Sequence, residues 1–193
     1  MGESSDDSIQ DLGFKMQNMM GNVEQPEQPR SFIVRYPKDG LCEGLDESWY
    51  IEVLPAFEKY GLSCTWNEDI RRMTVFETEY TGDPDMIFKG RLALIVLAAG
   101  QTTKWVEWIL SGRVHCDVIY IAKPDGMFRQ DFTSKYEEFI DKFDNIYELH
   151  KKLNCLVLYL GTSIIVLANT FEDTSKVRCQ LVEESLLSMQ HSF

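Results

Sequence analysis

The chain is poor in basic residues. Lysine and arginine together number 19 against 31 aspartates and glutamates, which gives a formal net charge of −12 and a pI near 4.7. Because lysine and arginine supply most non-specific affinity for phosphates, this balance argues against strong binding to nucleic acid. A local basic patch remains compatible with an acidic total, but none is visible along the sequence.

Motifs of catalysis and metal binding are also missing. The sequence contains no GxSxG, P-loop or GxGxxG pattern, and its histidines (115, 150 and 191) are isolated. His115 and Cys116 are neighbours in a strand-like run, so they would point to opposite faces. Asp83 and Asp85 fit helix capping better than a magnesium site. We therefore expect that the protein is not an enzyme and that it binds no cofactor, no metal and no small-molecule substrate.

Long apolar segments and a regular cysteine framework are absent as well. The longest apolar run, residues 92–99, is far shorter than the roughly 20 residues that a membrane helix needs, so we expect no membrane partner. The cysteines are odd in number, at positions 42, 64, 116, 155 and 179, and widely spaced. They are typical of reduced packing residues in a nuclear or cytosolic protein.

The second half of the chain shows clear periodicity. Apolar residues recur at helical spacing across residues 136–153, and two runs of strand formers, 155–160 and 164–168, flank Gly161 and Thr162. Glu172, Asp173 and Thr174 supply acidic and capping residues for a last helix. The pattern predicts a helix, a β-hairpin and a second helix.

The first half predicts a similar mixture. We expect a strand at 31–36, a helix at 46–60 that Pro55 interrupts, and strands at 62–66 and 73–77. Asp83 and Pro84 then open a helix that includes residues 92–99, although periodicity alone would also allow a buried strand there. A helix at 103–110 and a strand at 114–121 complete the predicted first module. The fold class is α+β.

Order and residues together resemble a known family. The residues that carry the resemblance in the second half are Asn154 to Gly161, Lys176 and Arg178. Upstream they are Arg72 to Val75, Asp83-Pro84 and His115 to Ile119. In their order along the chain, these residues are similar to the KRR family of small-subunit processome assembly factors. The similarity covers roughly residues 45–190. It implies two packed KH-like (type I) domains, which we place at 30–123 and 124–193, after an acidic tail at 1–29 that we expect to be disordered.

The departures from that family concern RNA binding. In a KH domain, a GxxG loop lets backbone amides approach nucleotides closely, which requires glycine. Alignment on Asn154 and Cys155 places the tetrad at Ile140, Asp141, Lys142 and Phe143, where both glycines are lost. Residues 129–152 carry five basic and six acidic side chains. We expect this loop to be degenerate, and the two helices that it normally separates to be fused or only slightly bent.

The resemblance sets the functional expectation. It implies a ribosome biogenesis factor of the nucleus and nucleolus that supports pre-rRNA processing and 40S assembly. From its own residues the chain should act mainly through protein partners in pre-ribosomal particles, with pre-rRNA bound weakly or indirectly. Trp105 and Trp108 share a short predicted helix and are the candidate partner interface or core residues. The alternative is a diverged KH-fold adaptor outside ribosome assembly.

Near helical spacing of Ile9, Leu12, Met16, Met19 and Met20 in the tail also suggests a short helix that could dock on a partner.

Overall fold

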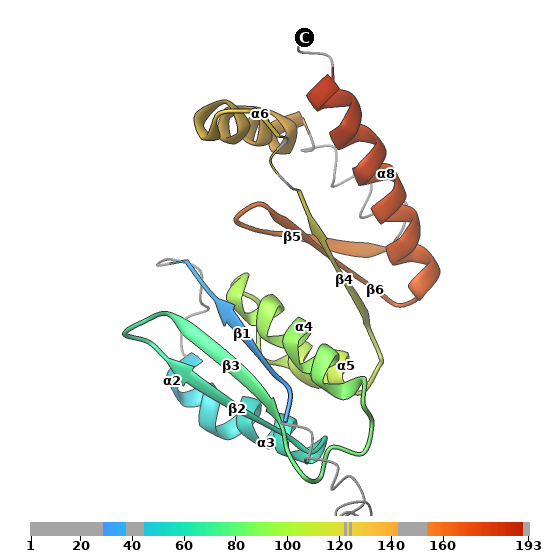
Figure 1. Ribbon diagram of the computed structural model, residues 1–193. Helices are drawn as coiled ribbons and strands as arrows, with labels where there is room; N and C mark the ends of the chain where they lie inside the picture. The colour runs from blue at the N-terminus through green and yellow to red at the C-terminus, as the bar shows by residue number, and fades with distance from the viewer. Residues whose placement is uncertain (1–28, 38–44, 122, 124, 143–153, 191–193) are drawn as a thin grey trace, which may run out of the picture.

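The computed structural model describes residues 29–37, 45–121, 123, 125–142 and 154–190 (Figure 1). The expected disorder and docking helix of the N-terminal tail fall outside these residues. The described chain forms two successive units that share one pattern: a strand, a helical segment, two further strands and a helix, which a second short helix follows in the first unit. This α+β architecture of two KH-like units agrees with the fold class that the sequence predicts.

The first unit consists of β1 (Ser31–Arg35), α2 (Leu45–Ser48), the π-helix η1 (Trp49–Val53), α3 (Leu54–Lys59), β2 (Leu62–Asn67), β3 (Arg72–Glu77), α4 (Met86–Ala98) and α5 (Lys104–Leu110). Its strands form an antiparallel sheet in the order β1-β3-β2. Alternate residues of these strands, such as Val34, Cys64 and Val75, are buried in the core, as the period of two in a half-buried strand requires.

Pro55 interrupts the first helix, as the sequence predicts. The helical segment from Leu45 to Lys59 changes from α to π over Trp49–Val53 and returns to α, with Pro55 in the first turn of α3. Proline has no N–H to donate to the preceding turn, so one regular hydrogen bond is missing at this point. The Leu54 N–H donates instead to the Trp49 carbonyl, five residues earlier, which is the spacing of a π-helix.

The second unit consists of β4 (His115–Tyr120), α6 (Arg129–Lys142), β5 (Cys155–Leu160), β6 (Ser163–Ala168) and α8 (Phe171–Gln190), and its sheet has the order β4-β6-β5. The hairpin at Gly161 is confirmed, and this glycine has a φ of 59°. The last helix begins with a cap that the sequence did not single out. Thr170 Oγ1 accepts from the Asp173 N–H at 3.2 Å and donates to the Asp173 carboxylate at 2.6 Å.

Three details differ from the sequence prediction. The strand at 114–121 was assigned to the first module, but β4 pairs with β6 along its whole length, so a boundary at 123/124 separates it from its own sheet. The helix predicted from residue 136 already begins at Arg129. Helix α4 begins at Met86 rather than at Pro84, and the Asp83 side chain accepts from the Asp85 N–H at 2.8 Å in the turn that leads into it.

Helix α4 lies between the two sheets (Figure 1). It contacts all three strands of the first sheet and also β4 of the second. Its residues Met86, Ile87, Gly90 and Ala93 through Ala98 are all buried, which explains why residues 92–99 form a continuous apolar run without a polar face. The helix prediction for this run is confirmed.

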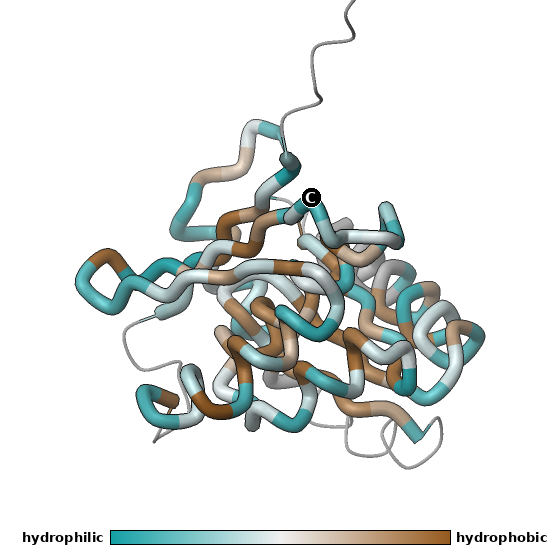
Figure 2. The backbone as a smooth tube through the Cα atoms, turned by 90° about the horizontal axis from the view of Figure 1, so that it is seen from below, coloured by the Kyte–Doolittle hydropathy of each residue, from teal (hydrophilic) through white to brown (hydrophobic). Residues whose placement is uncertain are grey.

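Two hydrophobic clusters follow from this arrangement. The larger joins the first unit to the inner side of the second sheet, and includes Val118, Ile165 and Leu167. The smaller lies between the second sheet and helices α6 and α8. Figure 2 shows the hydrophobic segments gathered in the interior and the hydrophilic turns around them. No helix within the described ranges is long and apolar enough to cross a membrane.

Candidate functional site

The position of the expected GxxG loop is helical as far as the structure describes it. Ile140, Asp141 and Lys142 are the last three residues of α6, and Phe143 lies outside the described residues together with the following segment up to 153. Within an α-helix each backbone N–H donates to the carbonyl four residues earlier, so it is not available to a nucleotide. The expectation of a fused second helix falls outside the described residues.

Apolar packing holds α6 at this place. Phe132, Tyr136 and Phe139 are buried in the smaller hydrophobic cluster, and Ile140 packs against it. The ring centroids of Phe132 and Tyr136 are 6.2 Å apart, and those of Tyr136 and Phe139 are 6.5 Å apart. The first tetrad residue thus serves the core. A GxxG loop at this position would replace a packed side chain by a bare backbone.

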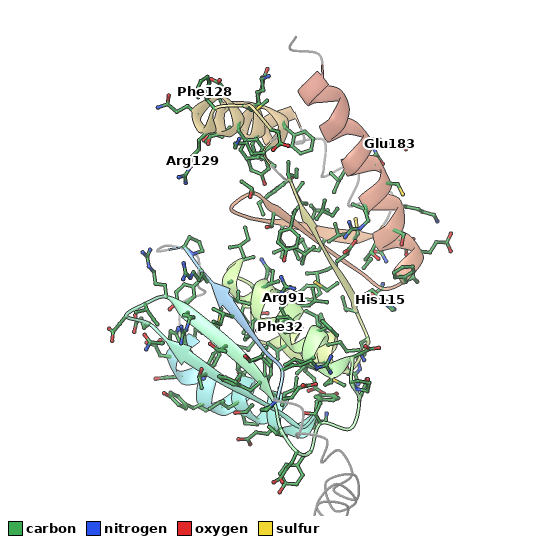
Figure 3. The ribbon with its side chains drawn as sticks, in the orientation of Figure 1. Phe32, Arg91, His115, Phe128, Arg129 and Glu183 are labelled. Atoms are coloured by element: carbon green, nitrogen blue, oxygen red, sulfur yellow. The ribbon has the colours of Figure 1, made fainter. Side chains whose placement is uncertain are left out.

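The surface of α6 offers little positive charge in its described part. Asp131, Glu137 and Glu138 are exposed, as is Arg129 at the start of the helix (Figure 3). Phe128, just before it, is 78% exposed. Phosphates are attracted by clustered lysine and arginine side chains, and the exposed residues named here form no such cluster.

The tryptophan pair lies at the edge of the larger core. Trp105 is half-buried and packs against the larger cluster, whereas Trp108 is 37% exposed. Their rings meet edge to face with centroids 5.1 Å apart. A base that stacks on an aromatic platform needs an open ring face. One side of the pair is thus covered by the edge-to-face contact, and Trp108 is its more exposed member.

A row of two arginines and three aromatic rings links the two units, and the sequence alone did not reveal it. The Arg30 guanidinium carbon lies 5.4 Å from the Phe88 ring centroid, and the Phe88 and Phe32 centroids are 5.5 Å apart. The Arg91 guanidinium carbon lies 5.1 Å from the Phe32 centroid, and its Nη2 donates to the Tyr120 hydroxyl at 2.9 Å. Figure 3 labels Phe32 and Arg91 in this row, between the two sheets.

This row ties α4 to β1 on one side and to β4 on the other. Cation–π contacts contribute on the order of 0.5–1 kcal/mol at exposed sites. The sequence signal that could have found it is the spacing of Phe88 and Arg91, three residues apart on one helix face. The other members of the row, in or next to β1 and in β4, are distant from α4 and from each other along the chain.

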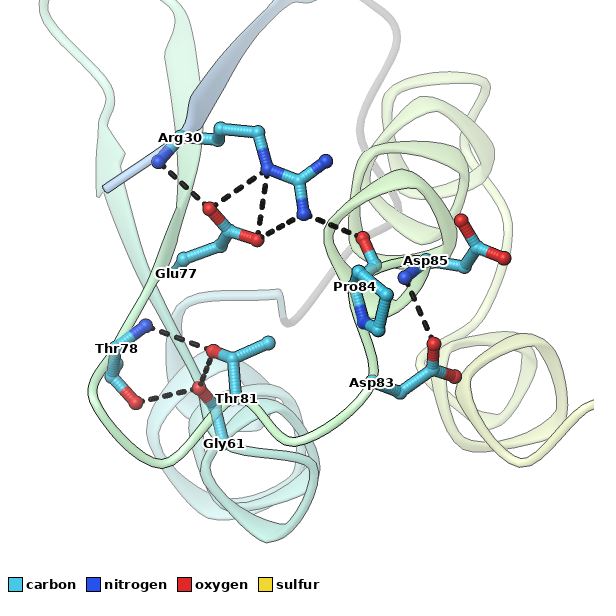
Figure 4. Close-up of polar contacts among 8 residues, drawn as sticks. All are labelled: Arg30, Gly61, Glu77, Thr78, Thr81, Asp83, Pro84 and Asp85. Carbon is cyan, nitrogen blue, oxygen red and sulfur yellow. Dashed lines mark hydrogen bonds and ion pairs between the residues drawn. The ribbon is translucent and has the colours of Figure 1, made fainter. Parts of the chain in front are cut away.

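A tightly bonded loop borders an open cleft of about 920 Å³ lined by Pro29, Arg30, Pro84 and residues 77–81. The Gly61 carbonyl accepts from Thr78 Oγ1 at 2.6 Å and Thr81 Oγ1 at 2.5 Å (Figure 4). Arg30 donates to both Glu77 oxygens and thereby lowers the pKa of that carboxyl group. The loop holds Tyr80 with 78% of its surface exposed.

The cysteines and histidines do not converge in the described residues. No group of three or more His, Cys, Asp or Glu side chains is placed there to hold a metal ion. Burial raises the pKa of the Cys64 and Cys116 thiols to about 12. Both thiols therefore stay protonated at neutral pH and behave as apolar packing groups.

Comparisons with solved structures identify the fold. The crystal structure of Dim2p from Pyrococcus horikoshii is similar at 14% identity and a TM-score of 0.56, over 81% of this chain and 90% of that one. The structure of its complex with a/eIF2alpha and rRNA is similar at 13% identity and a TM-score of 0.57, over 83% of this chain and 87% of that one. A protein of unknown function from Aeropyrum pernix is similar at 7% identity and a TM-score of 0.61, over 82% of this chain and 83% of that one.

These similarities support the two-unit KH-like fold over 81–83% of this chain. No protein-family model and no curated protein sequence matches the chain. At such low identity the shared feature is the fold, and the function is argued from the residues of this chain.

Proposed function

We propose that this chain is a ribosome assembly factor that supports pre-rRNA processing and assembly of the 40S subunit, mainly through protein contacts. By its resemblance to the KRR component of the small-subunit processome, it would reside in the nucleolus. Its partners would be proteins of pre-ribosomal particles, with pre-rRNA bound weakly or indirectly. The solved complex that contains aDim2p together with rRNA supports this setting, since the two proteins share the fold.

One observation carries the proposed mechanism. Ile140 packs against the core at the first position of the expected GxxG tetrad, and the next two residues continue the same helix. In the first unit, the helical segment from Leu45 to Lys59 contains no glycine either. Neither helical segment offers a glycine loop in its described part. RNA binding through the KH loop should therefore be weak or lost, and protein contacts remain as the mode of action.

The first test is the affinity of the full chain for single-stranded RNA, measured by fluorescence anisotropy between low and physiological salt. We expect no binding tighter than non-specific complexes, which have dissociation constants of roughly 10⁻⁶ to 10⁻⁴ M at physiological salt. Submicromolar binding with a steep dependence on salt would contradict the proposed mechanism. It would also show that a basic surface forms on folding.

The second test addresses the cellular role and the partner surface. We expect the tagged full chain to sediment with pre-ribosomal particles, and the Trp108→Ala variant to lose this association at least in part. Phe171→Ala is the matched control, because Phe171 is also an exposed aromatic residue, at 73%, but belongs to α8. Equal loss in both variants would argue against the tryptophan pair as the interface. A cytoplasmic chain absent from these particles would favour the adaptor outside ribosome assembly.

A further inference from the structure

The open face of the first sheet carries an unusual arrangement of charge. Arg35 of β1 and Arg72 of β3 are directly opposite each other in the antiparallel register, so their side chains leave the same face of the sheet. Both are exposed. Like charges at directly opposite positions destabilise a sheet, and an acidic protein would be expected to place a carboxylate beside them.

A third arginine, Arg71, lies in the turn beside the pair, and the same turn contains the exposed acids Glu68 and Asp69. The Tyr36 N–H donates to the Arg71 carbonyl at 3.3 Å, which brings the end of β1 next to the turn between β2 and β3. The side chains of Arg35, Arg71 and Arg72 make no ion pair with any residue that the structure describes. We call Arg35 and Arg72 the arginine face. Sequence reasoning missed it because Arg35 is 37 positions away from Arg72.

Apolar side chains accompany the arginine face. Ile33 precedes Arg35 by two residues on the same side of β1, and Ile70 precedes Arg71 in the turn; each is 55% exposed. The only aromatic ring on this side among the described strand residues is Phe76, at the opposite end of β3. Isoleucines beside arginines fit an acidic segment with aliphatic residues better than RNA, whose bases prefer aromatic platforms.

The chain itself contains such a segment. Residues 6–12 read Asp-Asp-Ser-Ile-Gln-Asp-Leu, with three carboxylates and two aliphatic side chains. They are joined to β1 through residues 13–30. The arginine pair lies at the far end of β1, four residues beyond Ser31, or about 13 Å at the rise of a β-strand. The connecting residues are long enough to span that distance several times.

We propose that residues 6–12 of this chain bind its own arginine face. Asp6, Asp7 and Asp11 supply carboxylates to Arg35 and Arg72, which form no ion pair within the described part of the chain, while Ile9 and Leu12 cover the exposed isoleucines. The covalent connection raises the effective concentration of the segment, so weak contacts suffice. In this arrangement the acidic segment shields the two arginines from phosphates of RNA.

Trypsin provides a direct test on the full chain, because Lys15 is the only basic residue among positions 1–28. Release of the fragment 1–15 is followed by mass spectrometry at low salt. We expect the Arg35→Glu/Arg72→Glu variant to release it about tenfold faster than the wild type, the change that corresponds to loss of about 1.4 kcal/mol of docking. The triple variant Asp6→Asn/Asp7→Asn/Asp11→Asn and high salt should have the same effect.

The matched control is Lys104→Glu/Arg113→Glu, which changes the net charge equally at exposed positions outside the arginine face. It should release the fragment at the wild-type rate, and circular dichroism should show that all variants are folded. Equal release rates in the wild type and in Arg35→Glu/Arg72→Glu would overturn the proposal. RNA binding that disappears in Arg35→Glu/Arg72→Glu without any change in fragment release would assign the face to RNA instead, and also overturn it.

Discussion

The two sheets have the same strand order but different surroundings. In the second sheet, the central strand β6 is buried on both sides: Ile165 and Leu167 belong to the larger cluster, and Ile164, Val166 and Ala168 to the smaller. In the first sheet, the central strand β3 buries Met73 and Val75 in the core, while on the other side Arg72 is exposed, Thr74 is buried and Phe76 is half-buried. The second sheet is a middle layer and the first is an outer layer.

Helix α4 is the cause of this difference. It covers the inner face of its own sheet, and it also contacts β4 of the second sheet. The second sheet thus depends on the first unit for the cover of one face, whereas the first sheet keeps a free surface. This asymmetry suggests that the two KH-like units fold as one cooperative structure, with the open face of the first unit available for binding.

Ile165→Ala should have the largest effect. Ile165 is fully buried on the α4 side of the second sheet, and removal of such a side chain costs about 2–5 kcal/mol. All four tryptophans, at positions 49, 66, 105 and 108, belong to the first unit. If the units are coupled, urea unfolding followed by tryptophan fluorescence shifts to lower denaturant together with the circular dichroism signal. An unchanged fluorescence curve would show that the units unfold separately.

Gly90→Val tests the close approach of α4 to the first sheet. A Cβ at position 90 would lie 2.8 Å from Leu62 Cδ1, 3.0 Å from Val75 Cγ2 and 3.3 Å from the Phe57 ring. Overpacking of this kind typically costs about 1–3 kcal/mol. Gly82→Val is the control, because a Cβ there meets nothing within 4 Å. Thermal melting should show a clear loss for the first variant only. Equal melting temperatures of the two variants would mean that the core accommodates the added side chain without loss of stability.

Two buried tyrosines distinguish the units at a smaller scale. In the first unit Trp66 Nε1 donates to the Tyr36 hydroxyl at 2.7 Å, whereas the Tyr136 hydroxyl in the second unit has no partner among the described residues. Tyr36→Phe should destabilise by about 1 kcal/mol because it leaves an indole N–H unpaired. Tyr136→Phe should be neutral or stabilising. Chemical denaturation of both variants measures the contrast, and a larger cost for Tyr136→Phe would reverse this interpretation.

The smallest expected effect is on stability at alkaline pH, because the difference between the wild type and Tyr136→Phe that comes from ionisation of the phenol is absent at neutral pH. Burial raises the pKa of Tyr136 from 10.0 to about 12. Below pH 10 the phenol is protonated in both states, and above it the unfolded state loses its proton first, so stability falls as pH rises towards 12. Tyr136→Phe should lose less stability than the wild type over this range in urea titrations. Parallel curves would argue against burial as the cause.

Local patterns predicted most of the elements. The helix over residues 92–99, the helix at 103–110, the hairpin at Gly161 and the interruption at Pro55 all depend on neighbouring residues, and all are present. The assignment of β4 failed because the partner of a strand is chosen by long-range packing. The cap at Thr170 was missed because Glu172, Asp173 and Thr174, just after it, were also plausible acidic and capping residues.

For the candidate site, the sequence predicted the loss of glycine but not the new contacts. Ile140, Asp141 and Lys142 could be placed in a helix from the apolar stripe alone. The roles of Trp105 and Trp108 as a partner surface stay a prediction. The row from Arg30 to Tyr120 and the arginine face join residues that are far apart in sequence, and no local pattern encodes which distant strands become neighbours.

By itself, the sequence determined the acidic charge, the order of helices and strands, and the absence of a glycine tetrad, because each depends on composition or on residues within one or two turns. Only the tertiary structure decided that α4 lies between two sheets, that β4 belongs to the second sheet, and that Arg35 lies opposite Arg72. These outcomes depend on burial of apolar surface between distant segments, which fixes pairing and register only when the whole chain packs together.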